Sequence, residues 1–145
     1  MTKTNHQLQR FIDAQADCYP EVVKELKHGK KLTHWMWFIF PQLKGLGRSE
    51  IAILYSIKSK AEARVFLNHL ILGKRLIECT ELVLGNKNTT AEDIFSYPDY
   101  LKFFSSMTLF DEISDGDNVF KQALLVFNDG QQDEATLDIL HRFKS

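Results

Sequence analysis

The residues best suited to bind or react gather in one stretch of the chain, from His34 to Ser49. Its first part contains six consecutive apolar residues, Trp35 to Phe40, and both tryptophans of the chain lie in this run, at positions 35 and 37. Since they are two residues apart, the indoles point to different sides of any helix. One indole can therefore fill the core while the other reaches a cleft. The alternative is that the whole run is core.

A glycine-containing turn follows the aromatic run. Gly45, Gly47, Arg48 and Ser49 precede a predicted helix that starts near Ile51. Free N–H groups at a helix start, a guanidinium and a hydroxyl are the components of an anion site. The turn lacks the third glycine of the dinucleotide fingerprint and the Gly-Lys-Ser/Thr ending of a P-loop. An ordinary turn with Ser49 as the helix N-cap is the competing interpretation.

Several polar side chains lie beside apolar residues, where they need partners from the protein or from a ligand. Gln42 follows the aromatic run, and Gln15 interrupts the apolar stripe of a predicted helix. Ser106 and Thr108 belong to an aromatic-rich helix, where hydroxyls bond the carbonyl four residues back unless they line a cavity. His34 precedes the aromatics and is the best candidate for general acid–base catalysis, with helix capping as its alternative role.

Together these groups predict a site for a small anionic, nucleotide-like ligand and leave open whether a reaction follows binding. An indole would stack on the flat part of the ligand, the guanidinium and the glycine turn would hold its charge, and the amides and hydroxyls would orient it. The predicted ligand-binding residues are Gln15, His34, Trp35, Trp37, Gln42, Gly47, Arg48, Ser49, Ser106 and Thr108.

Other chemistries find little support in the residues. The five histidines show no His-x-x-x-His spacing and the two cysteines no Cys-x-x-Cys spacing, so we expect no metal site and no cofactor. Cys18 and Cys79 fall on apolar stripes, where a thiol is normally inert. The chain has no Gly-x-Ser-x-Gly turn to carry a nucleophilic serine.

The charges are unevenly distributed along the chain. Residues 1–75 hold 13 of the 18 Lys and Arg residues but only 6 of the 19 Asp and Glu residues. Either the two halves attract each other across the fold, or the basic half faces an anionic partner. The second interpretation makes the chain a protein-interaction adaptor. Because the pI is near 6.5, we do not expect nucleic acid as the partner. The predicted docking face is Lys24, Lys27, Lys30, Lys31 and Lys44.

The elements that would position these residues are helices throughout. Apolar residues recur at helical spacing along most of the chain, and no stretch alternates apolar and polar residues long enough for a strand. We therefore predict an all-α fold of seven to nine short helices. The predicted helix starts are Pro20 as a first residue, Thr33 and Ser49 as N-caps, capping boxes at Ser59/Glu62 and Thr89/Glu92, and N-caps at Asp117 and Asp133.

We expect one domain over residues 1–145, with an ordered core from about 8 to 143. A domain of this length buries roughly 68–70% of its unfolded surface, enough for a core without metal or disulfide support. The longest apolar run has six residues, whereas a membrane helix needs about 20. No signal peptide is evident at the N-terminus. Together with the two free cysteines, this predicts a cytoplasmic protein.

The segment His34–Gln42 followed by Gly45–Ser49 resembles the signature of a bacterial family catalogued as domain of unknown function 1810. Asp13–Gln15, Leu72–Thr80 and Ser105–Phe110 carry further resemblance, which extends from about Leu8 to Phe143. The resemblance implies a mainly α-helical fold of one domain and no established activity. Some relatives are labelled calpastatin, but inhibitors of that kind are extended and disordered, whereas this composition requires a packed core.

Overall fold

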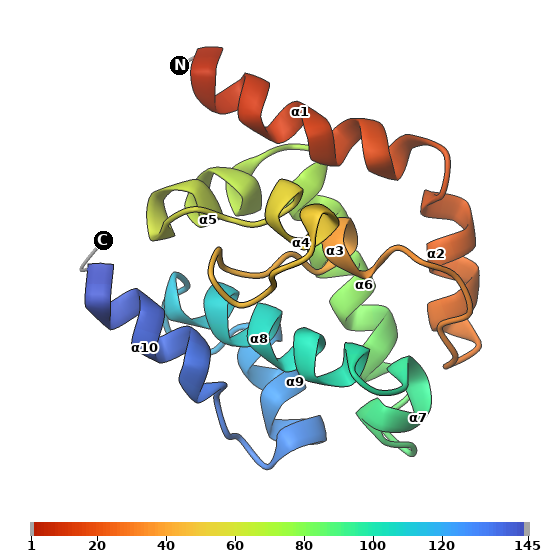
Figure 1. The fold of residues 1–145 in the computed structure, drawn as a ribbon. Helices are drawn as coiled ribbons and strands as arrows, with labels where there is room; N and C mark the ends of the chain where they lie inside the picture. Colours follow the sequence, from red (N-terminus) through yellow and green to blue (C-terminus); the bar gives the residue numbers. More distant parts are fainter. Residues whose placement is uncertain (1, 144–145) are drawn as a thin grey trace.

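Ten helices and no strand lie in the part of the chain that the computed structural model describes, which is the backbone of residues 2–143 with the side chains of residues 8–142. The fold is a single compact all-α domain (Figure 1). Seven of these helices have nine or more residues, within the seven to nine predicted, and the other three have only four or five. The helices are α1 Thr2–Ala16, α2 Tyr19–Lys27, α3 Met36–Ile39, α4 Glu50–Leu54, α5 Lys60–Asn68, α6 Leu72–Leu84, α7 Ala91–Phe95, α8 Asp99–Glu112, α9 Val119–Asn128 and α10 Glu134–Phe143.

Helix α8 runs through the middle of the domain, with α5, α7, α9 and α10 packed against it (Figure 1). All residues from Phe103 to Asp111 are buried, as the aromatic repeat predicts. The Phe103 ring lies 4.7 Å from the Phe95 ring and 5.1 Å from the Phe40 ring, so it joins α7 and α3 to α8. Aromatic pairs at these spacings add to the stabilisation from apolar burial.

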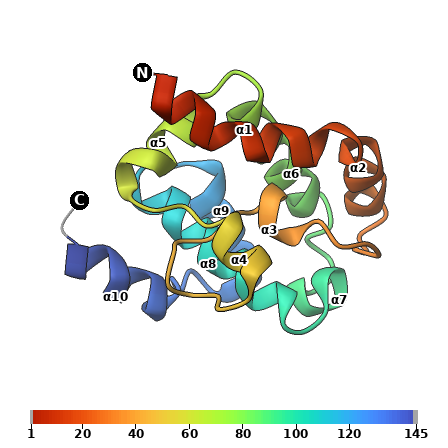
Figure 2. The same ribbon diagram turned by 45° about the horizontal axis from the view of Figure 1, so that its top comes forward.

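Helix α1 crosses the domain above α3 and α5 (Figures 1 and 2). Phe11 packs edge-to-face on Phe66 of α5 with the ring centroids 5.0 Å apart. The neighbouring Arg10, whose guanidinium lies over the Phe11 ring, donates from Nε to the Leu54 carbonyl at 2.6 Å and from Nη2 to the Ser56 carbonyl at 2.9 Å. These bonds satisfy carbonyls at the end of α4 and tie that end to α1.

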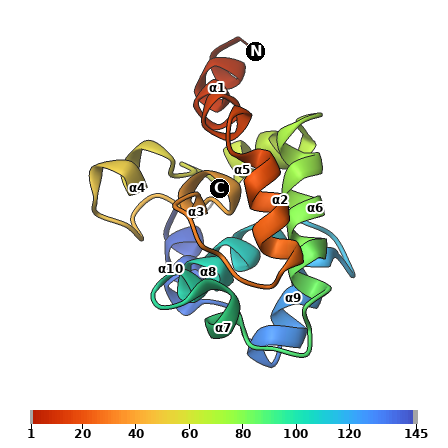
Figure 3. The ribbon, with the colours of Figure 1, turned by 90° about the vertical axis from the view of Figure 1, so that its right-hand side faces the viewer.

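The chain from α2 to α5 is mostly irregular, and one parallel β-bridge orders it. Leu43 pairs with Ile57. The Ile57 N–H donates to the Gln42 carbonyl at 2.8 Å, and the Lys44 N–H donates to the Ile57 carbonyl at 2.7 Å. Between these segments α4 stands out from the helical body, and none of its residues is buried (Figure 3). The predicted helix from Ile51 therefore ends at Leu54, because Ile57 is used in the bridge.

Three predicted N-caps are confirmed by backbone hydrogen bonds to their side chains. Ser49 accepts from Ala52 N at 3.2 Å, Ser59 from Glu62 N at 3.1 Å and Asp133 from Thr136 N at 3.1 Å. Gly29 and Gly130 follow α2 and α9 with φ of 71° and 79°, a region that favours glycine.

Three other predicted caps are wrong. Thr90, not Thr89, caps α7, and Asn118, not Asp117, caps α9. In both pairs two adjacent residues can cap, and the apolar pattern alone does not distinguish them. Thr33 does not cap α3, whose N-cap position is Trp35, because the Thr33 hydroxyl binds Glu25 instead. In residues 2–143 no helix is long and apolar enough to cross a membrane.

Replacing Phe103 with alanine tests whether α8 is the centre of the core. We expect Phe103→Ala to lower the free energy of unfolding by about 3–5 kcal/mol, because it removes a ring that three elements share and leaves a cavity. Urea denaturation followed by circular dichroism measures this loss. Leu125→Ala, at a position 52% exposed, is the matched control and should change stability by less than about 0.5 kcal/mol. Equal losses in the two variants would contradict the assignment.

Candidate functional site

A solvent-open cleft of about 370 Å³, called here the Trp37 cleft, lies between α3, the loop before α4, and the first turns of α8 and α10. These four segments are far apart in the sequence, and packing on the α8 core brings them together. A cleft of this volume is large enough for a small molecule. The lining residues are Trp37, Gln42, Leu46, Gly47, Arg48, Ser49, Ala52, Pro98, Leu101, Lys102, Ser105, Asp133 and Ala135.

Of the two indoles, one lies in the core and the other in the cleft, which is one of the two arrangements that the sequence left open. Trp35 is 1% exposed and packs on Phe40, with the ring centroids 6.2 Å apart. Trp37 is half-buried and lines the cleft. Lys102 of α8 places its Nζ 4.5 Å from the centroid of the Trp37 ring, a cation–π contact that brings a positive charge beside the indole.

A buried carboxylate holds the segment that leads into α3. Glu25 of α2 is 4% exposed. Its Oε1 accepts from the Trp35 Nε1 at 2.8 Å, from the Leu32 N–H at 2.7 Å and from the Thr33 N–H at 3.1 Å, and its Oε2 accepts from the Thr33 hydroxyl at 2.7 Å. Burial by itself raises the pKa of a carboxyl, but these hydrogen bonds outweigh it and leave the pKa of Glu25 below its ordinary value. The carboxylate therefore stays ionised and fixes the path of the chain into the aromatic run.

Sequence reasoning missed Glu25, although a signal was present. It lies three residues after Val22 and one before Leu26, both fully buried, so it belongs to the apolar stripe of α2. A charged residue in such a stripe must find partners, which is the argument that singled out Gln15.

The start of α10 forms another wall of the cleft, and hydrogen bonds hold Asp133 in place there. Its Oδ2 accepts from the Ser105 hydroxyl at 3.1 Å, from the Thr136 hydroxyl at 2.6 Å and from the Thr136 N–H. The Asp133 N–H donates to the Thr108 hydroxyl at 2.8 Å. Thr108 thus holds the cleft wall from within the core and does not itself line the cleft.

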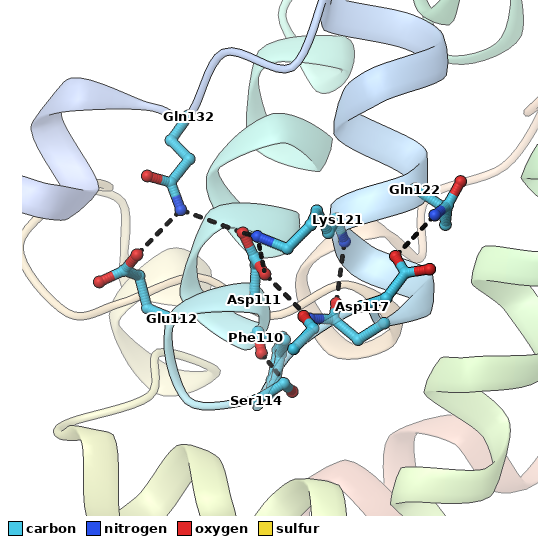
Figure 4. Close-up of polar contacts among 10 residues, drawn as sticks. Phe110, Asp111, Glu112, Ser114, Asp117, Lys121, Gln122 and Gln132 are labelled. Carbon is cyan, nitrogen blue, oxygen red and sulfur yellow. Dashed lines mark hydrogen bonds and ion pairs between the residues drawn. The ribbon is translucent and has the colours of Figure 1, made fainter.

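The preceding residue, Gln132, is anchored in turn by a polar cluster at the end of α8 (Figure 4). Its Nε2 donates to the Asp111 Oδ2 at 3.1 Å and to the Glu112 Oε2 at 2.9 Å. Asp111 also accepts from the Asn118 Nδ2 at 2.9 Å and pairs with the Lys121 Nζ at 3.3 Å. Asp111 therefore joins α8, α9 and the loop before α10, and sets the position of the wall that carries Asp133.

The remaining predicted site residues lie outside the cleft. Gln15 is 1% exposed, and its partners are protein groups, the Phe38 carbonyl at 2.7 Å and the Arg75 Nη1 at 3.2 Å. Ser106 is fully buried in α8, and its hydroxyl has no hydrogen-bond partner among the described residues. His34 is exposed and is not among the residues that line the cleft.

The structure thus brings half of the predicted set together and adds groups that the sequence reasoning missed. Lys102 and Ser105 border the cleft because they lie on the face of α8 opposite its aromatic stripe. The stripe was visible in the sequence, and helical spacing puts residues 98, 101, 102 and 105 together on that opposite face. Asp133 was predicted only as a helix start. The predicted residues in the cleft are Trp37, Gln42, Gly47, Arg48 and Ser49.

Positive charge in the cleft comes from side chains more than from a helix end. Arg48 and Lys102 both line it. Helix α4 has only five residues, the Ser49 hydroxyl oxygen already caps it, and Glu50 in its first turn offsets its dipole. Gly47 is required where it stands, since a Cβ there would lie 2.5 Å from the Ala52 Cβ. In the described part of the chain, no group of three or more His, Cys, Asp or Glu side chains could hold a metal ion.

The cysteine thiols lie away from the cleft. Cys79 is fully buried, and burial raises the pKa of its thiol to about 12. Cys18 is half-buried, and its pKa is raised as well, mainly by burial. The reactive thiolate is therefore scarce at neutral pH in both residues.

Comparison with known proteins identifies relatives without an assigned role. A family model described as "Protein of unknown function (DUF1810)" matches residues 5–140. The crystal structure of the conserved hypothetical protein Rv1873 from Mycobacterium tuberculosis is similar to this chain, with 47% sequence identity and a TM-score of 0.91. The match covers 92% of this chain and 96% of that one. Among curated proteins none matches this chain.

Replacing Glu25 with glutamine tests its role in holding the aromatic run. At pH 7 we expect Glu25→Gln to lower the free energy of unfolding by about 2–3 kcal/mol, because donors that faced a carboxylate then face a neutral amide. The pKa of Glu25 is lower in the folded state than in the unfolded state. The stabilisation that the ionised carboxylate contributes is therefore fully present above the unfolded-state pKa and is lost as the pH falls through the folded-state pKa. The stability gap between wild type and variant should therefore shrink as the medium is acidified.

Urea denaturation at pH 7 and at acidic pH measures both effects. Glu21→Gln, at an exposed position of the same helix, is the matched control and should follow wild type at every pH. A gap that stays constant with pH would show that Glu25 does not act through its charge.

Proposed function

This chain belongs to the DUF1810 family, whose description assigns no function, and from its geometry we propose that the Trp37 cleft binds a small anionic, nucleotide-like ligand. One observation carries the proposal: an indole, a guanidinium and an ammonium converge on one concave surface. Aromatic faces bind flat rings, and paired cations bind phosphate or carboxylate groups.

The aromatic part of the ligand would bind at Trp37. This indole is half-buried, so it is held in place and still presents surface to the cleft. Leu101 and Pro98 line the same cleft and add apolar surface. Stacking of a base on an aromatic side chain contributes roughly 1–3 kcal/mol.

The anionic part would bind at Arg48 and Lys102. A guanidinium offers two parallel donors to a phosphate or carboxylate, and an ammonium acts as a point charge. Lys102 also pairs with Asp99 at 3.3 Å. Because Asp99 pairs with Lys31 at 2.9 Å as well, Lys102 can turn towards an anion without leaving Asp99 unpaired.

The polar groups around the cleft favour a ligand that also carries hydrogen-bond donors. Asp133 repels an anion but accepts hydrogen bonds from hydroxyl or amino groups. Within residues 2–143 every hydrogen bond that its carboxylate accepts goes to Oδ2, so Oδ1 is left for such a donor. Gln42 offers both an acceptor and a donor. A nucleotide combines the three required properties: a flat ring, an anionic group, and hydroxyl or amino donors.

Binding of nucleoside mono- and diphosphates, followed by thermal shift and by quenching of tryptophan fluorescence, tests the proposal. We expect at least one nucleotide to raise the melting temperature. Arg48→Gln should weaken binding about tenfold, equivalent to about 1.4 kcal/mol for a lost charge-assisted hydrogen bond. Trp37→Leu should weaken binding and abolish most of the quenching. Arg64→Gln, which removes an exposed guanidinium on α5, is the control and should leave binding unchanged. No response to any nucleotide, or an unaltered affinity in Arg48→Gln, would contradict the proposal.

A second proposal is docking of an acidic partner on α2 and the turn after it. Lys24, Lys27 and Lys30 are exposed there. Lys31 is less available, since its Nζ pairs with Asp99 and lies 5.3 Å from the Trp35 ring centroid. Lys44 lines a cleft with Ile139 and Arg142 of α10. Helix α10 lies on the opposite side of the domain from α2 (Figures 1 and 2).

Titration with a labelled polyglutamate peptide tests this docking face. Binding should weaken as salt rises, because exposed charges are screened. It should also weaken in the triple variant Lys24→Gln, Lys27→Gln, Lys30→Gln, but not in Lys74→Gln, which removes an exposed charge from α6. Equal affinity in the triple variant and wild type would contradict docking at this face.

A further inference from the structure

A second cleft, of about 450 Å³, lies between residues 44–45 of the loop before α4 and the C-terminal turns of α10. Among the described residues that line it, three are cations and none is a carboxylate. We call it the Lys44 cleft, and it is lined by Lys44, Gly45, Lys58, Ile139 and Arg142. The proposed ligand of the Trp37 cleft does not use these residues, so the charges in the Lys44 cleft need an explanation of their own.

The parallel bridge forces two of the cations together. Leu43 and Ile57 are paired, and their side chains are 3% and 0% exposed, so both point into the core. Successive residues of extended chains point to opposite faces, and so the next residue on each segment, Lys44 and Lys58, points outward on the same side. Both lysines are exposed.

Hydrogen bonds from the backbone N–H groups of both lysines fix the segments that carry them. The Lys44 N–H donates to the Ile57 carbonyl at 2.7 Å. The Lys58 N–H donates to the Glu62 Oε1 at 2.8 Å. Like charges that lie side by side on paired segments repel each other and weaken the pairing. Here the hydrogen-bonded main chain holds Lys44 and Lys58 in place despite that repulsion.

Helix α10 supplies the third cation. Ile139 is 8% exposed, and its Cδ1 lies 3.3 Å from the position that a Cβ on Gly45 would occupy, so α10 touches the loop at this point. Gly45 has φ of 106°, a conformation that favours glycine. Arg142 follows Ile139 by three residues and lies on the same face of α10. Its guanidinium therefore borders the cleft beside the two lysines.

No ion pair in the described part of the chain neutralises these charges. The ion pairs there involve Arg10, Lys31, Lys102 and Lys121, and none involves a cation of the Lys44 cleft. Three cations that converge on one hollow favour an anion carrying more than one negative charge. The volume suits a small molecule.

We propose that the Lys44 cleft is a second anion site, and that it binds a small ligand with a multiply charged phosphate group, of the pyrophosphate class. The two ammonium groups neutralise the charge, and the guanidinium binds the phosphate oxygens in parallel. This site stands on different residues from the proposed nucleotide cleft, so either can exist without the other.

Isothermal titration of the full chain with inorganic pyrophosphate at low salt tests the proposal. We expect saturable binding that weakens at least tenfold in the double variant Lys44→Gln, Lys58→Gln, and also weakens in Arg142→Gln. The double variant Lys74→Gln, Lys87→Gln removes the same charge from exposed positions on α6 and the turn after it and should bind like wild type. Arg48→Gln, in the Trp37 cleft, should retain the pyrophosphate binding that the Lys44→Gln, Lys58→Gln variant loses. Melting temperatures of all variants confirm that they are folded.

Three results would overturn the proposal. The first is no saturable binding of pyrophosphate to wild type at low salt. The second is an equal loss of affinity in the two lysine double variants, which would reflect net charge alone. The third is a loss in Arg48→Gln without a loss in Lys44→Gln, Lys58→Gln, which would assign the phosphate to the Trp37 cleft.

Discussion

The buried carboxylate of Glu25 is the constraint on which the candidate nucleotide site depends. One side chain accepts hydrogen bonds from two backbone N–H groups, a hydroxyl and an indole, and so it gathers residues 32–35 on α2. An ionised carboxylate is costly to bury, and it stays ionised here because its donors replace the lost water. With Trp35 anchored in the core, the next indole, Trp37, is left to face the Trp37 cleft.

Helix α8 supports both the core and the cleft because its two faces differ. The aromatic face, centred on Phe103, packs against α3 and α7. The opposite face of its first turns presents Lys102 and Ser105 to the cleft. At its other end Asp111 holds α9 and the loop before α10 (Figure 4), so one rigid helix sets the distance between the walls. A site assembled on packed helices is better defined than one carried by loops alone.

The loop from Gln42 to Ser49 separates the two clefts, and α10 contributes to each of them. This arrangement shows where some of the basic residues of the first half of the chain lie in the fold. The basic first half pairs with the acidic second half through Lys31 and Asp99. Other cations of the first half, Arg48 and Lys44 among them, line the clefts instead. Cations gathered in hollows are the basis of both anion proposals, and in the Lys44 cleft none of them forms an ion pair with a described carboxylate.

The sequence by itself determined the all-α class and most helix positions, because these follow from local spacing, but it left open whether either indole reaches a cleft. Cap positions were predictable only within a residue where two neighbours could cap, as at Thr89 and Thr90. Only the tertiary structure decided which groups share a cleft. Lys102 and Asp133 lie far from Trp37 in the chain and meet it through helix packing, whereas Gln15 finds its partners within the protein. Periodicity tells which face of a helix is buried, but not which other helix that face will meet.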